Sequence, residues 1–210
     1  MIPHITYQEL SQLLPQLSSQ RFPKIAMEDM YFEQRRVAQA IARRRKASAS
    51  SNGGLEGPFV PLVYVPGILD RLQALGEHCR FHTGVPAKLR ELAICITARH
   101  IGAGVEFFVH AIEAREFGLA EAKLEAIAEG KRPDGLDEEE AVVYDFTVAL
   151  HETGQVSDAL FARAEECFGK AIILDLIATC GYYATLGMVL NVTRTALPPS
   201  VPLPFVVAAD

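Results

Sequence analysis

The longest apolar stretch of the chain, residues 171–192, constrains the fold more than any other feature. It reads AIILDLIATCGYYATLGMVLNV and is long enough to cross a bilayer as a helix. Asp175, Asn191 and several Thr and Gly residues interrupt it, and the rest of the chain reads as amphipathic helix of the soluble kind. We therefore expect a helix buried in a core or in a subunit interface, and no membrane span.

Helix-start signals recur along the chain, whereas strand patterns are few. Thr6 with Glu9 and Asp137 with Glu140 form capping boxes, and Ser157 is suited to cap a further helix. The spacing of apolar residues, Pro and Gly predicts other helices over residues 26–46, 66–81, 87–101, 106–117 and 120–129, and from residue 170 onward. The predicted fold class is all-α.

Three Pro- or Gly-rich segments separate or follow these helices. Residues 47–54 (ASASSNGG) read as a flexible loop, residues 57–67 (GPFVPLVYVPG) as an extended stretch, and residues 197–205 (LPPSVPLPF) as a tail that cannot be helical. We divide the chain into an N-terminal helical extension and loop over 1–56, a domain over 57–205 and a tail over 206–210.

Composition excludes several classes of function. The net charge is −6, so the chain lacks the positive field that would attract DNA or RNA, and we expect no nucleic-acid partner. The first residues, MIPHITYQELSQ, lack the basic and then apolar pattern of a secretory signal, which predicts a cytoplasmic protein. The four cysteines form no Cys-x-x-Cys pair and lie in apolar helical contexts, which predicts buried, reduced thiols.

Glu106 and His110 are the first candidates for chemistry. They are four residues apart on one predicted helix, so both lie on the same face together with Phe107, Ala111 and Ala114. A carboxylate beside an imidazole in an apolar setting raises the pKa of the imidazole and fixes its tautomer, which suits proton transfer near neutral pH. An ordinary ion pair on a solvated face has the same spacing, and this alternative stays open.

Glu91 is a second candidate carboxylate, because it lies among apolar residues in RELAICI and needs either an exposed face or a partner. The Gly102–Gly104 break allows its helix to fold back on the next one, which would bring Glu91 towards Glu106 and His110. Two carboxylates and one His could also bind a metal, but no further ligand with zinc-like spacing is visible, so we expect none. Nucleotide, Ser-nucleophile and zinc-protease motifs are absent from the sequence, and we expect no cofactor.

The run from Leu72 to Pro133 resembles the carboxymuconolactone decarboxylase family. The family pattern has an acidic residue in an RELAI-like helix, then Glu-x-x-x-His, an Ala four residues later and a Gly eight residues later. Here these positions hold Glu91, Glu106, His110, Ala114 and Gly118. The resemblance covers about residues 57–205 and implies an alkylhydroperoxidase D-like helical bundle.

Related thiol peroxidases carry a Cys-x-x-Cys before the equivalent His, but this chain has Ala103 and Glu106 at those places. Peroxide reduction needs a low-pKa thiolate and a resolving thiol, so the resemblance does not imply that activity.

The resemblance implies decarboxylation, without a cofactor, of a small lactone or carbonyl carboxylic acid. His110 would protonate the carbon, Glu106 would orient and charge His110, and Glu91 would relay a proton or hold the pair in place. The substrate carboxylate would bind to an arginine, for which Arg80, Arg90 and Arg99 are candidates.

Other readings of the same site remain open: an isomerase, dehydratase or hydrolase of a related carbonyl compound, or a non-catalytic oligomer that binds a ligand. The resemblance also implies a homo-oligomer, a trimer or a hexamer, and the long apolar helix supplies surface for such contacts.

Overall fold

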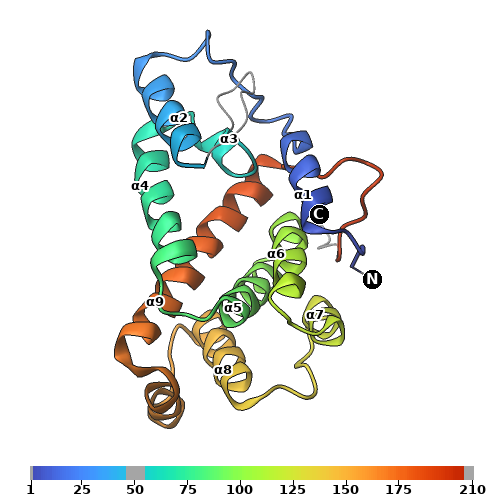
Figure 1. Cartoon of the computed structure of the whole chain (residues 1–210), viewed down its shortest axis with the longest axis vertical. Helices are drawn as coiled ribbons and strands as arrows, with labels where there is room; N and C mark the ends of the chain where they lie inside the picture. The colour runs from blue at the N-terminus through green and yellow to red at the C-terminus, as the bar shows by residue number, and fades with distance from the viewer. Residues whose placement is uncertain (1, 46–54, 206–210) are drawn as a thin grey trace.

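The computed structural model describes residues 2–45 and 55–205, and this part of the chain is helical, which confirms the all-α prediction. It contains no strand; a single isolated bridge joins Ser18 and Ala196. In chain order the elements (Figure 1) are α1 (Tyr7–Leu13), the 3-10 helix η1 (Leu14–Gln16), α2 (Phe32–Arg45), α3 (Phe59–Leu62), α4 (Pro66–Glu77), the π-helix η2 (His78–His82), α5 (Ala87–His100), α6 (Gly104–Glu116), α7 (Glu121–Ala128), α8 (Glu138–Thr153) and α9 (Asp158–Thr193).

The predicted helix starts are confirmed where a side chain caps the helix. Thr6 and Asp137 each accept a hydrogen bond from the backbone N–H three residues later, and the glutamates at those positions complete both capping boxes. Ser157 accepts from the backbone N–H of Leu160 at the start of α9. These contacts satisfy N–H groups that have no partner within the helix itself.

Two predictions were wrong. The helix expected over 26–46 begins only at Phe32, because the side chain of Gln34 accepts from the backbone N–H of Tyr31 and so caps the helix there. The stretch over 57–67 is not fully extended but contains α3, whose single turn tolerates Pro61. The helix expected over 66–81 is present over 66–82, and its last turn has the π-helical form of η2. The loop predicted over 47–54 lies outside the described residues.

Helix α9 is two helices joined at a kink. Gly169 has φ 73° and ψ 165°, a backbone conformation that favours glycine, so the apolar second half begins at Lys170, as predicted. By length and composition α9 could cross a membrane, and 44% of its most apolar window is buried within the protein. Its inner face packs in the core, while Leu174, Met188 and Val192 remain exposed on the outer face.

Two large hydrophobic clusters meet at α5. One joins α5 and α6 to α7, α8 and the middle of α9, and the other joins α2, α3 and α4 to the end of α9. Neighbouring residues of α5 belong to different clusters, Cys95 to the first and Ile94 to the second. Helix α5 is therefore buried on most of its circumference, and its polar residues have to find partners inside the protein.

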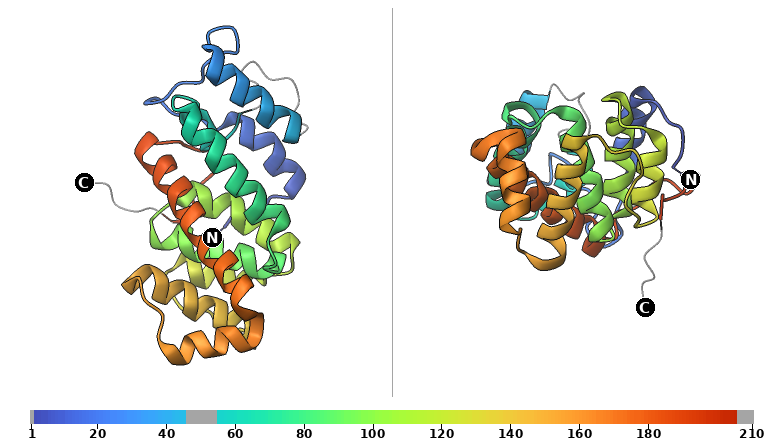
Figure 2. Two further views of the ribbon diagram at one scale, coloured as in Figure 1. Left: turned by 90° about the vertical axis from the view of Figure 1, so that its left-hand side faces the viewer. Right: turned by 90° about the horizontal axis from the view of Figure 1, so that it is seen from below.

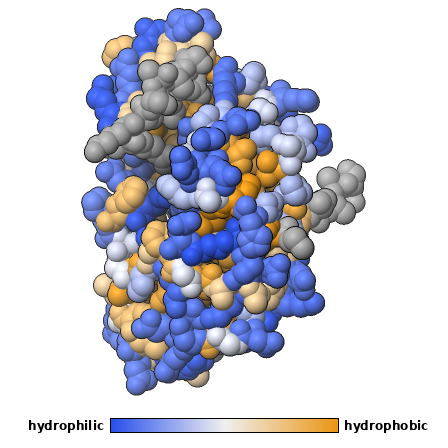
Figure 3. Space-filling model, turned by 45° about the vertical axis from the view of Figure 1, so that its right-hand side comes forward, coloured by the Kyte–Doolittle hydropathy of each residue, from blue (hydrophilic) through white to orange (hydrophobic). Residues whose placement is uncertain are grey.

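The N-terminal extension packs on the rest of the chain. Leu10 of α1 lies against Phe108 and Ile112 of α6, and α2 contributes Val37 and Ile41 to the second cluster. Helix α9 runs diagonally through the molecule and contacts α4 over part of its length (Figure 2). Figure 3 shows one face, on which hydrophilic side chains surround an apolar area near the middle.

Candidate active site

The contact between α5 and α6 brings Glu91 and His110 together in the interior. The Gly102–Gly104 break turns the chain, with Gly102 at φ 68°, so that the two helices pack against each other. Glu91 is fully buried and His110 is 3% exposed. The Nδ1 atom of His110 lies 2.7 Å from Oε2 of Glu91, within hydrogen-bond distance. The predicted approach of Glu91 to His110 is thus observed.

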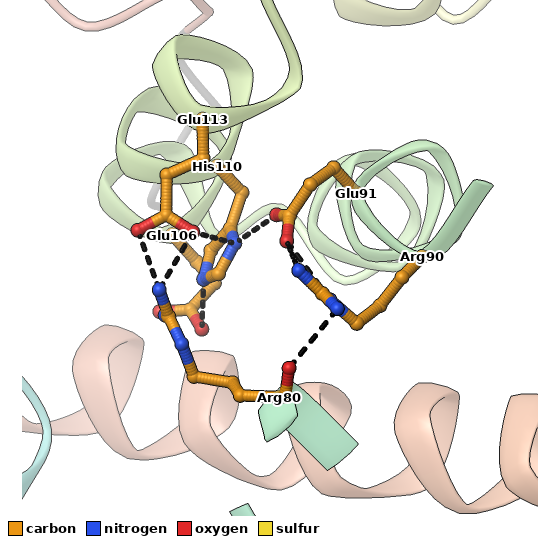
Figure 4. Close-up of polar contacts among 6 residues, drawn as sticks. All are labelled: Arg80, Arg90, Glu91, Glu106, His110 and Glu113. Atoms are coloured by element: carbon orange, nitrogen blue, oxygen red, sulfur yellow. Dashed lines mark hydrogen bonds and ion pairs between the residues drawn. The ribbon is translucent and has the colours of Figure 1, made fainter. Parts of the chain in front are cut away.

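Two arginines and a further glutamate complete a cluster of six ionisable side chains (Figure 4). Arg90 donates from Nε and Nη2 to Oε1 of Glu91, at 3.1 and 3.0 Å, and from Nη1 to the carbonyl oxygen of Arg80. Arg80 donates to both carboxylate oxygens of Glu113 at 2.9 Å. Because a buried charge is costly without a partner, the pairing of three acidic with three basic groups is what allows the cluster to be buried.

Glu106 differs from the other two carboxylates of the cluster. Its Oε1 lies 3.7 Å from Nε2 of His110, and no hydrogen-bond donor of a described residue reaches its carboxyl group. Glu106 and His110 are both buried, so the alternative of an ion pair on a solvated face was wrong. The hydrogen bond that orients His110 is accepted by Glu91, and not by Glu106, because Glu91 faces His110 across the contact between α5 and α6.

Burial and pairing move the pKa values of these groups in different directions. Burial raises the pKa of Glu106 to about 7, because the nearby charges of His110 and Arg80 only partly offset the loss of water. Burial alone would lower the pKa of His110, but the charge and hydrogen bond of Glu91, with Glu113 and Glu106, raise it. Burial would raise the pKa of Glu91, but His110, Arg90 and Arg80 outweigh it and lower it. The site therefore places a carboxyl group that titrates near neutrality beside an imidazole whose pKa is raised.

Apolar and aromatic side chains enclose the cluster. The ring of Tyr183 from α9 packs edge-on against the imidazole of His110, with ring centroids 4.7 Å apart. Phe107 and Ala111, which neighbour the motif on α6, are fully buried in the first hydrophobic cluster. Such surroundings strengthen the electrostatic interactions inside the cluster.

The cluster is closed towards solvent by Arg80. Its side chain is 27% exposed, whereas the side chain of Glu113 is 6% exposed and that of Glu91 is fully buried. Arg80 belongs to the π-helix η2, a type of turn that is frequent at functional sites. Asp175 of α9 holds this segment, because its carboxylate contacts Nε2 of His78 and accepts from the backbone N–H of Gly84, both at 2.8 Å.

Glu91, His110 and Glu113 satisfy the simplest geometric condition for a metal site. One ligand atom from each lies within 4.8 Å of the others. Both carboxylates already accept hydrogen bonds from guanidinium groups, so a cation would have to compete with Arg90 and Arg80. The donor set therefore fits an internal salt-bridge network better than a metal centre.

The structure separates the three candidate arginines. Arg80 and Arg90 belong to the cluster, whereas Arg99 lies about two turns further along α5 and donates from Nε to the carbonyl oxygen of Ala128. Glu113 was missed in the sequence, although it follows His110 by three residues and so lies on the same face of α6.

The cysteines make no hydrogen bond to the cluster, although Cys95 lies one turn after Glu91 on α5. All four are free; Cys79, Cys95 and Cys180 are buried, whereas Cys167 is half-buried, in part contrary to the prediction. Burial raises the pKa of Cys95 well above its usual value and that of Cys180 to about 11, so both stay protonated thiols at neutral pH.

Comparison with known proteins adds no family. A scan against protein-family models found none that matches the chain, and a search of curated proteins found no match. The resemblance described from the sequence therefore depends on its motif residues alone.

Proposed function

We propose that this protein is a cofactor-independent acid/base enzyme that decarboxylates a small lactone or carbonyl carboxylic acid. The observation that carries the proposal is the arrangement around His110. Its Nδ1 is 2.7 Å from the buried carboxylate of Glu91, and its Nε2 faces Glu106, whose pKa is raised to about 7. A charged imidazole, with a second proton carrier beside it, is what a protonation step near neutral pH requires.

The reaction needs few groups. The bond between the substrate carbon and its carboxylate breaks, carbon dioxide leaves, and the electron pair moves through a conjugated bond into the carbonyl, which gives an enolate. His110 donates the proton on Nε2 to the carbon, Glu106 returns a proton to Nε2, and Glu106 takes up a proton from solvent before the next turnover. Glu91 keeps the imidazole oriented and charged, because its contact with Nδ1 stabilises the imidazolium.

Arg80 is the residue that we assign to the substrate carboxylate. It is the most exposed of the six side chains in Figure 4, and it already holds a carboxylate, that of Glu113, through two hydrogen bonds. A substrate carboxylate could replace Glu113 on this guanidinium with the same geometry. The same group of residues could also serve an isomerase, dehydratase or hydrolase of a related carbonyl compound.

A second candidate function is non-catalytic: a helical oligomer in which the cluster only stabilises the core. The observation that favours it concerns the hydrogen bonds of buried polar side chains. Within residues 2–45 and 55–205, no side-chain nitrogen or oxygen atom that is fully shielded from solvent lacks a hydrogen-bond partner, and the carboxyl group of Glu106, which accepts no hydrogen bond, keeps a small solvent contact. A network that exists for stability alone would look the same.

Turnover of defined compounds distinguishes the two candidates. The protein is incubated with a panel of unsaturated lactone acids and β-keto acids, and carbon dioxide release is measured together with the imidazole signals of His110 by NMR. The proposal expects release by the wild type and loss of release in His110→Gln. Glu140→Gln is the matched control, because Glu140 is also a buried glutamate paired with cations, Lys88 and Lys123, but lies outside the cluster.

Two outcomes contradict the enzyme proposal. In the first, His110→Gln, folded by circular dichroism, turns over a panel compound as fast as the wild type. In the second, no panel compound is turned over and none shifts the His110 signals, which would favour the non-catalytic candidate.

We also propose that the chain forms a homo-oligomer. The exposed apolar residues on the outer face of α9, among them Leu174 and Met188, support this proposal, because apolar helix faces of this kind often pack against another subunit. Light scattering at micromolar concentration tests it, and a stable monomer would contradict it.

A further inference from the structure

The far end of α5 borders an open cleft of about 290 Å³, which the acid/base chemistry does not use. Its lining includes Ile96 of α5, Ile127 of α7 and Val148 of α8. Ile127 is buried and anchors α7, so these walls are part of the hydrophobic core rather than of a loose surface. These apolar residues form the floor of the cleft, and polar groups make up most of its accessible lining.

Arg99 lies at this cleft and is held in place without an ion pair. Its Nε donates to the carbonyl oxygen of Ala128 at 2.8 Å, and its guanidinium lies 4.9 Å from the ring centroid of Phe205. Gly130, at φ 75°, makes room for it, since a Cβ there would lie 3.0 Å from Nη2 of Arg99. Among the described residues no carboxylate pairs with Arg99, in contrast to Arg80 and Arg90.

Other polar groups of the lining add positive charge. Among the described residues, Lys131 pairs only with Glu129; both side chains are exposed, and such a pair contributes little. Of the described residues that line the cleft, Glu152 is the one acidic residue, against Arg99 and Lys131. The imidazole of His100 also lines the cleft and stacks on His151, with ring centroids 5.0 Å apart.

The geometry points to this cleft as a binding site for a small organic monocarboxylate. The carboxylate lies between Arg99 and Lys131, and the apolar body of the ligand lies against Ile96, Ile127 and Val148. A planar guanidinium that is already positioned binds a carboxylate through two parallel hydrogen bonds at little entropic cost. The inference does not rest on the proposed function, because none of these residues belongs to the acid/base cluster.

Benzoate is the probe for this site. It is titrated into the full-length protein, and binding is followed through the methyl signals of isoleucine and valine by NMR. We expect the signals of Ile96, Ile127 and Val148 to shift, and we expect benzamide, which has the same shape without the charge, to bind about tenfold more weakly.

Two substitutions test the charges. Arg99→Gln should weaken benzoate binding about tenfold, since it removes a charge-assisted hydrogen-bond donor. Lys131→Gln changes an exposed side chain, so the fold is unaffected, and it should weaken binding about threefold. Arg132→Gln is the control, because Arg132 is a neighbouring arginine that pairs with Asp145 instead, and it should bind benzoate as the wild type does.

The inference is overturned if benzoate shifts none of the three methyl signals, if benzamide binds as tightly, or if Arg99→Gln and Lys131→Gln both bind like the wild type. His110→Gln separates this site from the acid/base site. Benzoate binding at the cleft should be the same in that variant, whether or not the variant loses turnover.

Discussion

Helix α5 carries charged residues near both of its ends, and the two groups differ in what neutralises them. Arg90 and Glu91, in its first half, are buried and paired with each other, and Glu91 also contacts His110. Arg99 and His100, in its last turn, contact a carbonyl oxygen and aromatic rings but no carboxylate of a described residue.

The difference shows that burial determines whether a charged group is paired within the protein or available to a ligand. In the first half of α5, removal from water forces each charge to find an internal partner, so the network is closed and rigid. In the last turn, contact with solvent makes the charge of Arg99 tolerable without a carboxylate partner, so its guanidinium stays available for a ligand. The first group suits proton chemistry in a dry setting, and the second suits reversible binding from solution.

The largest expected effect is on stability in the first half of α5, where Arg90 and Glu91 are buried and paired. Glu91→Gln leaves Arg90 and His110 without their anionic partner, and removal of one member of a buried pair costs about 4 kcal/mol of the free energy of unfolding. Chemical denaturation measures it. Glu140→Gln is the comparison variant. It should lower the free energy of unfolding by less, because the ammonium group of Lys88, whose side chain is 33% exposed, can be hydrated instead. Equal costs for the two variants would contradict the distinction.

The second prediction concerns the pH dependence of stability. The folded protein holds a proton on Glu106 up to about pH 7, whereas the unfolded chain releases it near the ordinary value of 4.5. The native state binds more protons in this window, so the contribution of Glu106 to stability falls as the pH rises, by about 3 kcal/mol in all. Glu106→Gln should remove this fall.

The measurement is a set of denaturation curves between pH 5 and pH 8 for both proteins, since the difference between them isolates Glu106 from His110, whose raised pKa acts in the same direction. If the two proteins lose stability in parallel, Glu106 does not titrate in this window.

The third prediction concerns turnover on any substrate that the wild type accepts. His110→Gln keeps the shape and hydrogen bonding of the side chain but cannot cycle a proton, so turnover should fall by about 100-fold or more. Steady-state kinetics on the folded variant gives the value. An unchanged rate would mean that the cluster around His110 has only a structural role.

The smallest expected effect is on stability in the last turn of α5, where Arg99 lies. Arg99→Gln removes one hydrogen bond to a carbonyl and one contact with an aromatic ring, and it should cost less than about 1 kcal/mol because no charge is left unpaired. The denaturation assay used for Glu91→Gln applies here. A cost as large as that of Glu91→Gln would place Arg99 in a network like the buried one.

Local signals in the sequence predicted most of the fold. Caps such as Thr6 and Asp137 are set by residues three positions apart, and the Glu106–His110 spacing is equally local. The short helix α3 and the π-helical form of η2 were not predicted; both pack against α9, and no local pattern indicates a contact between segments so far apart in the sequence.

The site was harder to predict than the helices. The approach of Glu91 to His110 followed from the glycine break, but which carboxylate contacts which ring nitrogen depends on the rotation of α5 against α6. The pairing of Arg80 with Glu113 joins two helices that are far apart in the sequence, and no periodicity indicates it. Glu113 itself could have been found, because it repeats the helical spacing of the motif.

Under the proposed function, Arg80 on η2 also affects substrate affinity. If the substrate carboxylate takes the place of Glu113 on this guanidinium, binding requires that the Arg80–Glu113 pair is open. The apparent dissociation constant is then the intrinsic one divided by the fraction of open molecules, and if about one molecule in a hundred is open, affinity weakens about 100-fold. Under the proposed function, the affinity for a substrate is thus determined jointly by the fit of the substrate and by the strength of one internal ion pair.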